Sequence, residues 1–172
     1  AVALLAAVAT APLLLAAFEG RGLRRALRPF ATLYGILVGG AVLALLASAA
    51  RGRSPLELLG AYRAATSSDY TAGGVLRFFL YHVAELDLYS GVLPFAAFLV
   101  LGSFVFARGD RQARVVAAVF VSTTFWLLLT AAAFISSVSS YDVHTEMARI
   151  SDRYTFYALP LMLIAIVAWV AR

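Results

Sequence analysis

Four charged side chains near the end of the chain fall on one stripe if the segment that carries them is helical. Asp142, Glu146, Arg149 and Arg153 follow one another at intervals of four, three and four residues. Those intervals return to the same face of a helix with 3.6 residues per turn. Two arginines one turn apart form a fork suited to a phosphate or pyrophosphate, because each guanidinium offers paired donors in one plane. The stripe therefore predicts an anion-binding site, with Tyr154 beside it.

The same stripe also allows a plainer interpretation. Glu146 and Arg149 can form an ion pair within one helical turn. Arg153 and Tyr154 can anchor a helix at the interface between membrane and water, where such residues are common. Both interpretations place this segment where a helix meets the membrane surface.

A second polar cluster, of Tyr81, His82, Glu85 and Asp87, lies among aromatic residues. His82 and Glu85 share a helix face, and a histidine with a carboxylate could ligate a divalent cation or act as a base. Two ligands leave a metal site incomplete, and His144 would have to come from a distant loop. The cluster therefore favours a hydrogen-bonded pair of His82 and Glu85 on a water-exposed surface. The sequence identifies no cofactor, and a divalent cation stays open.

The elements that must position these residues are apolar helices. The chain is 63% hydrophobic and 13% charged, with a mean hydropathy of +0.89, whereas soluble domains are near half apolar and about a quarter charged. A hydrocarbon core about 30 Å thick needs roughly 20 helical residues. Five segments approach that length without an interior charge: 1–18, 30–50, 91–107, 115–135 and 154–171. We predict an all-α, polytopic transmembrane bundle that forms a single domain over residues 1–172.

Between the predicted spans lie two long polar segments, 51–90 and 136–153. A capping box at Ser54 predicts a short helix over about 54–65, followed by a polar loop over 66–74. A second helix is predicted over 75–89, ending at Gly91. Both helices are expected to lie along the membrane interface, although the second could also continue as a tilted part of the third span.

Two glycines in the second predicted span, Gly35 and Gly39, form a small-xxx-small pair with Gly40 beside them. Such pairs let helix backbones approach closely in membranes. We expect a neighbouring helix to pack against this face.

The distribution of arginine predicts the orientation of the chain. Short connections rich in arginine lie on the cytoplasmic side of a membrane. The two short links carry Arg21, Arg24, Arg25 and Arg28, and then Arg108, Arg111 and Arg114, whereas the long segments hold six basic and seven acidic residues. We therefore expect a multi-pass protein of the plasma membrane with its N-terminus outside and its C-terminus in the cytoplasm. The net charge of +5 is spread over separate loops, which argues against a nucleic-acid partner.

The run from Arg149 to Leu161 resembles a pattern in bacterial polytopic glycosyltransferases of the GT-C superfamily, the protein-mannosyltransferase-like and arabinosyltransferase-like enzymes. Asp152, Arg153, Tyr154, Leu159 and Pro160 match that pattern, with Asp152 in place of the common glutamate. The resemblance implies transfer of a sugar from a polyprenyl-phosphate carrier to an acceptor on the outer face of the cell envelope. It also implies that Arg149 and Arg153 lie near the carrier phosphate, with Tyr154 beside the prenyl chain.

In such enzymes the catalytic carboxylate usually lies in the first outer loop. The chain is therefore expected to be the C-terminal part of the enzyme, with the catalytic acid and the remainder of the polypeptide upstream. Two other functions stay open. A transporter or flippase for a lipid or small solute could use the same arginines for an anionic headgroup, although no charged mid-membrane helix supports it. A structural membrane subunit without a ligand is the second.

Overall fold

The computed structural model describes residues 2–20, 22, 24, 27–52, 71–139 and 152–171, with the backbone alone at 137–139 and 152–155. These residues form helices and the turns between them, as the all-α prediction requires. The helices are α1 (Val2–Glu19), the 3₁₀ helix η1 (Arg28–Phe30), α3 (Ala31–Ala50), α5 (Ala72–Ser90), α6 (Val92–Arg108), α7 (Arg111–Ser139) and α8 (Asp152–Val170). The predicted helix over 54–65 lies outside the described residues.

The apolar helices are compatible with a membrane protein. Among the described residues, three helices are long and apolar enough to cross a bilayer: α1, the continuous unit Arg28–Ala50, and α7. A fourth crossing results if α5 and α6, which meet at a bend of 113°, count as one span. The segment predicted as the fifth span forms α8, whose apolar part is Phe156–Val170. The count of five spans stays a prediction.

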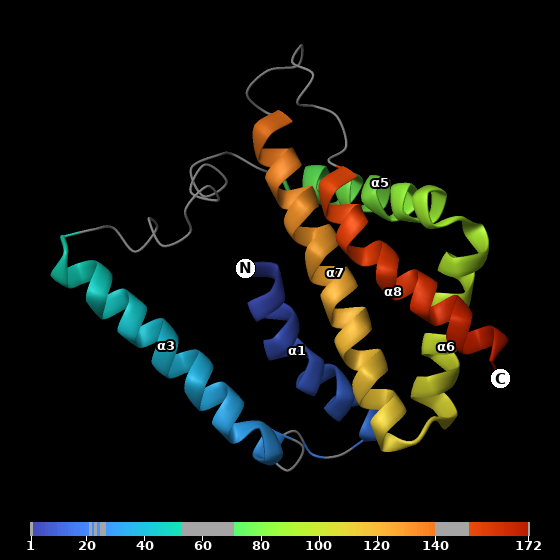
Figure 1. Ribbon diagram of the computed structural model, residues 1–172. Coiled ribbons are helices and arrows are strands. Elements are labelled where there is room, and N and C mark those ends of the chain that lie inside the picture. Colours follow the sequence, from blue (N-terminus) through green and yellow to red (C-terminus); the bar gives the residue numbers. More distant parts are fainter. Residues whose placement is uncertain are drawn as a thin grey trace.

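Helix α7 is the centre of the bundle, and α1 packs along it (Figure 1). Ala3, Ala7 and Ala11 are buried at intervals of four residues on one face of α1. Small side chains at this spacing let two helix backbones approach closely. The Nε1 atom of Trp126 on α7 donates a hydrogen bond to Thr10 Oγ1 at 2.8 Å, which fixes the register of α1 against α7.

Helix α5 lies across one end of α7 and α8 (Figure 1). Leu86 of α5 is fully buried against Leu128, Ala158 and Met162, which come from α7 and α8. A second buried cluster joins Phe78 to Ala132 and Ile135 of α7. These two clusters hold α5 at an angle to the other helices, so that it closes this end of the bundle.

The start of α5 differs from the prediction. The expected loop over 66–74 ends at Thr71, and Ala72, Gly73 and Gly74 already belong to the helix. Thr71 caps it, because its Oγ1 accepts a hydrogen bond from the Gly74 amide at 3.1 Å. A Cβ at Gly74 would lie 3.0 Å from Ser136 Oγ of α7. The glycine therefore allows a close approach between helices.

The break after α5 falls where the sequence predicts it. Gly91 has φ +82° and ψ +146°, a backbone conformation that is essentially restricted to glycine. The chain turns there through 113° into α6. The predicted end of the helix at Gly91 is thereby confirmed.

Helix α3 stands apart from the other helices (Figure 1). Ser48 is the one buried residue of this helix. Helix α3 contacts α1 through a 2.7 Å hydrogen bond from the Tyr34 hydroxyl to the Ala9 carbonyl. Nothing lies within 4 Å of the Cβ positions built at Gly35, Gly39 and Gly40. The helix predicted to pack against these glycines is therefore absent from the described part of the chain.

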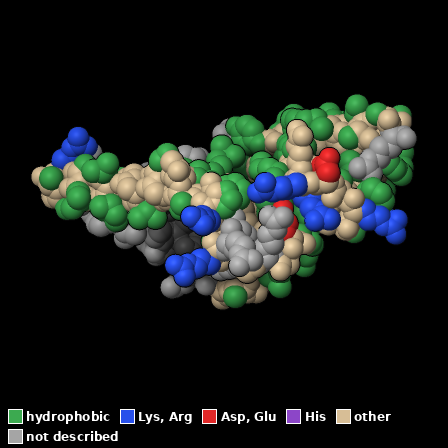
Figure 2. All heavy atoms as spheres, turned by 90° about the horizontal axis from the view of Figure 1, so that it is seen from below, with side chains coloured by type: hydrophobic (Ala, Val, Ile, Leu, Met, Phe, Trp, Pro, Cys, Tyr) green, Lys and Arg blue, Asp and Glu red, His purple; other side chains and the backbone are tan. Residues whose placement is uncertain are grey.

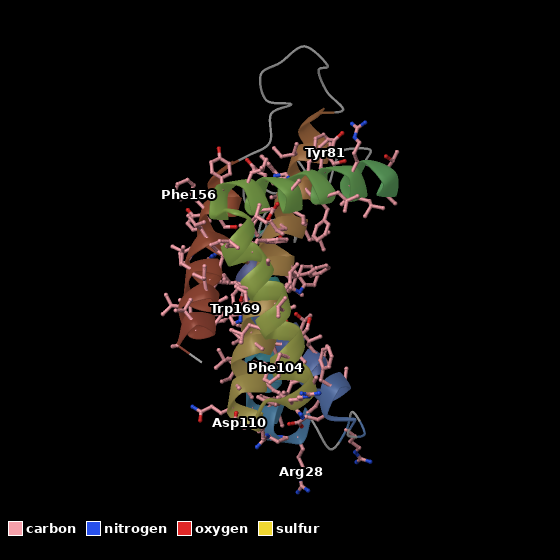
Figure 3. The ribbon with its side chains drawn as sticks, turned by 90° about the vertical axis from the view of Figure 1, so that its right-hand side faces the viewer. Arg28, Tyr81, Phe104, Asp110, Phe156 and Trp169 are labelled. Atoms are coloured by element: carbon pink, nitrogen blue, oxygen red, sulfur yellow. The ribbon has the colours of Figure 1, made fainter. Side chains whose placement is uncertain are left out.

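The two arginine-rich links lie at one end of the bundle. The end of α1, η1, the end of α6 and the start of α7 all lie opposite α5 (Figure 1). Figure 2 shows arginine side chains around this end. Figure 3 places Arg28 and Asp110 there, with Tyr81 and Phe156 at the other end. The shared side predicted for the two links agrees with this arrangement.

Candidate functional site

The polar cluster of α5 lies on the face that packs into the bundle. His82 is 0% exposed and Glu85 is 8% exposed, and both share this buried face with Phe78 and Leu86. The shared helix face of His82 and Glu85 is as predicted. The prediction that they lie on a water-exposed surface is wrong. Phe78 and Leu86 lie on the same stripe of α5, and when these apolar residues pack into the bundle, His82 and Glu85 are buried with them.

The hydrogen bonding of His82 defines which ring nitrogen carries the proton. Its Nδ1 lies 2.7 Å from the Phe78 carbonyl oxygen, and a carbonyl only accepts, so Nδ1 is the donor. In the neutral ring, Nε2 then carries a lone pair. Nε2 is buried and has no hydrogen-bond partner in the part of the chain that the structure describes. A buried polar atom without a hydrogen-bond partner lowers the stability of the folded state by about 1–3 kcal/mol.

Beside this pair, α5 forms one wall of an open pocket. The pocket has a volume of about 450 Å³ and is lined by Tyr81, Ala84, Glu85, Leu88 and Tyr89. The two tyrosines are about half exposed, and each combines an aromatic face with a polar hydroxyl. The Glu85 carboxylate accepts hydrogen bonds when it is ionised. This combination suits a ligand that carries hydroxyl groups on an otherwise apolar ring.

The pocket lies beside the first turns of α8. The rings of Tyr89 and Phe156 have centroids 6.4 Å apart, and Leu86 contacts α8 through Ala158 and Met162. Phe156 follows Arg153 and Tyr154, which lie in the first turn of α8, by less than one turn. The fold therefore brings the α5 cluster and the start of α8 to the same end of the bundle.

The other predicted site residues are not placed in this way. Asp142, Glu146 and Arg149 lie outside the described residues, and only the backbone is described at Arg153 and Tyr154. No group of three or more metal-ligating side chains occurs among the residues that are described, so His82 and Glu85 do not form a metal site by themselves.

No protein-family model, curated protein or solved structure matches this chain. The chemistry of the site is therefore inferred from its own residues and their positions.

Two features of this site were not predicted from the sequence. Tyr89 and Phe156 lie far apart along the chain and become neighbours only because α5 packs against α8. The burial of His82 had a local signal: Phe78, His82 and Leu86 are spaced four residues apart, which is the spacing of a buried helix face.

Proposed function

We propose that this chain is the C-terminal part of a membrane glycosyltransferase that moves a sugar from a polyprenyl-phosphate carrier to an acceptor. Transfer takes place at the end of the bundle where α5 meets α8. The observation that supports this proposal best is the pocket beside Glu85 and the buried His82, adjacent to the helix α8, whose first turn contains Arg153 and Tyr154. The pocket on α5 and the backbone of Arg153 then lie at the same end of the described bundle.

The depth of α5 supports a location at the membrane surface. Arg114 marks the arginine-rich end of α7, and Ala132, which contacts α5, comes 18 residues later (132 minus 114). At 1.5 Å per residue this separation is about 27 Å, close to the thickness of a hydrocarbon core of about 30 Å. Helix α5 then lies at the opposite headgroup level and is the outer interfacial helix that the sequence predicts. With the arginine-rich end in the cytoplasm, the N-terminus of α1 lies outside and the C-terminus of α8 inside.

Each group has a defined role in the transfer. The acceptor oxygen forms a bond to the anomeric carbon, and the bond from that carbon to the carrier phosphate breaks. The departing phosphate gains negative charge, which Arg149 and Arg153 stabilise. Glu85 and the tyrosines Tyr81 and Tyr89 hold the sugar hydroxyls. The base that accepts the acceptor proton is expected upstream of this chain.

The test measures sugar transfer in membranes that contain the full-length enzyme and a radiolabelled polyprenyl-phosphate-linked sugar. Glu85→Gln and Arg153→Gln are each expected to reduce transfer by about tenfold or more, because each removes a charged hydrogen-bonding group worth about 1.5–3 kcal/mol. Asp87→Asn is the matched control for Glu85, since Asp87 lies on the same helix but outside the pocket lining. It should leave transfer within about twofold of the wild type.

Wild-type rates in both site variants would contradict the proposed roles. Uptake of the lipid or of a solute into proteoliposomes, without any covalent product, would support the transporter in place of the enzyme.

A further inference from the structure

A second cavity lies between α6, α7 and α8, toward the arginine-rich end. We refer to it as the lateral groove. Its volume is about 390 Å³, within the range of about 300–1,000 Å³ that is usual for small-molecule sites. Apolar side chains and Gly102 make up its walls, and the two strongly polar lining residues are Asp110 and Gln112. The groove is thus apolar along its length and polar at one end.

The polar end coincides with the link between α6 and α7. Phe98 and Phe120 line the inner part of the groove, whereas Asp110 and Gln112 lie next to the start of α7. In Figure 3, Asp110 lies at the end of the bundle opposite Tyr81. A chain-like apolar ligand with a polar head would therefore lie in the half of the membrane away from α5.

The charges at this mouth favour an anion. Arg108 is not part of the groove lining, but it follows the lining residues Leu101 and Val105 of α6 by seven and three positions, so it lies on the same side of this helix. Its guanidinium lies 5.9 Å from the centre of the Phe104 ring. Asp110 caps α7, because its Oδ1 accepts a hydrogen bond from the Ala113 amide at 2.7 Å. Its negative charge therefore faces the positive end of the α7 dipole, and Arg108 and the amide of Gln112 are left to meet a ligand.

We propose that the lateral groove binds one acyl chain of an anionic phospholipid, with the phosphate next to Arg108 and Gln112. A lipid tail is as apolar as the groove, so hydrocarbon contact alone gives little preference over the surrounding bilayer. The selectivity must come from the headgroup. This site lies at the opposite end of the bundle from the pocket beside Glu85, and it does not depend on the proposed sugar transfer.

The test uses the full-length protein, delipidated in detergent and titrated with lipid, and the bound lipid is measured by native mass spectrometry. The probes are phosphatidylglycerol and phosphatidylcholine with identical acyl chains. The wild type is expected to retain phosphatidylglycerol about fivefold more strongly, the preference that one arginine near a lipid headgroup supplies. Arg108→Gln should remove most of that preference.

Gly102→Leu tests the groove itself. A Cβ at Gly102 meets no atom within 4 Å, so the added side chain extends into the groove without a clash. We expect this variant to bind phosphatidylglycerol about tenfold more weakly, because the leucine side chain occupies the space that the acyl chain would fill. Gly73→Leu is the matched control, because Gly73 is also helical with open space around its Cβ but lies in α5 at the opposite end. It should bind lipid as the wild type does.

Three results would overturn the proposal. They are equal retention of the two lipids by the wild type, unchanged selectivity in Arg108→Gln, and unchanged binding in Gly102→Leu. Circular dichroism and size-exclusion profiles identical to the wild type show that a loss of binding in a variant arises at the site.

Discussion

Replacement of His82 by leucine should stabilise the protein. The change removes the hydrogen bond from Nδ1 to the Phe78 carbonyl, which is worth about 1 kcal/mol for neutral groups. It also removes the buried Nε2 that has no hydrogen-bond partner among the described residues, which relieves a cost of about 1–3 kcal/mol. Since His82 is fully buried beside Leu86, the leucine also adds apolar contact. We expect a net gain of about 1 kcal/mol.

The assay is thermal unfolding in detergent, followed by the fluorescence of the two tryptophans in the chain. For a chain of about 150–250 residues, 1 kcal/mol corresponds to about 2–4 °C in Tm. Leu86→Ala calibrates the measurement, because it opens a cavity in the same cluster and should lower stability by about 2–5 kcal/mol.

The result that refutes this reasoning is a loss of stability in His82→Leu similar to that in Leu86→Ala. Nε2 would then have a partner in the folded protein, such as an ordered water. If the imidazole is retained for function, sugar transfer should fall in the same variant whose Tm rises, as is usual where activity and stability compete.

Three further predictions concern the bend, a helix pair and the topology. Gly91→Ala should lower the free energy of unfolding by about 1–3 kcal/mol in the same thermal assay. This loss comes from the backbone conformation and not from a clash, because the nearest contact of the added Cβ is an ordinary 3.7 Å. A double-mutant cycle of Thr10→Val and Trp126→Phe should give a coupling energy near 0.6 kcal/mol, and additive effects would contradict their hydrogen bond. The chain has no native cysteine, so a single introduced cysteine reports which side of the membrane its position faces. Gly22→Cys should react with an impermeant maleimide from one side of the membrane, and Thr71→Cys from the other side. Labelling of both variants from the same side would contradict the predicted topology.

The sequence predicts helices better than it predicts what they contact. The apolar length of α1, α3 and α7 is a local property, and so is the break at Gly91, where the main chain needs a conformation that glycine tolerates. The start of α5 was misplaced because paired glycines usually indicate a loop. Gly74 is instead needed for the close approach to Ser136, which comes from a distant part of the chain.

The candidate site follows the same division. His82 and Glu85 were identified from their types and spacing, but their burial depends on α7 and α8 packing against α5. The packing of α5 against α8 places the pocket next to the start of α8, and no local residue pattern encodes that contact. The glycines of α3 indicate a packing face, yet they do not specify which helix fills it.

The pairing of α1 with α7 has a consequence for biosynthesis. The two residues of their hydrogen bond, Thr10 and Trp126, are 116 positions apart. At a synthesis rate of about 5–20 residues per second, α1 leaves the ribosome about 6–23 s before its partner. During that interval the face of α1 that later meets α7 is exposed to lipid. Alanines dominate this face, and the Thr10 hydroxyl bonds to the Ala6 carbonyl of its own helix at 2.8 Å. Helix α1 can therefore enter the bilayer early and dock late.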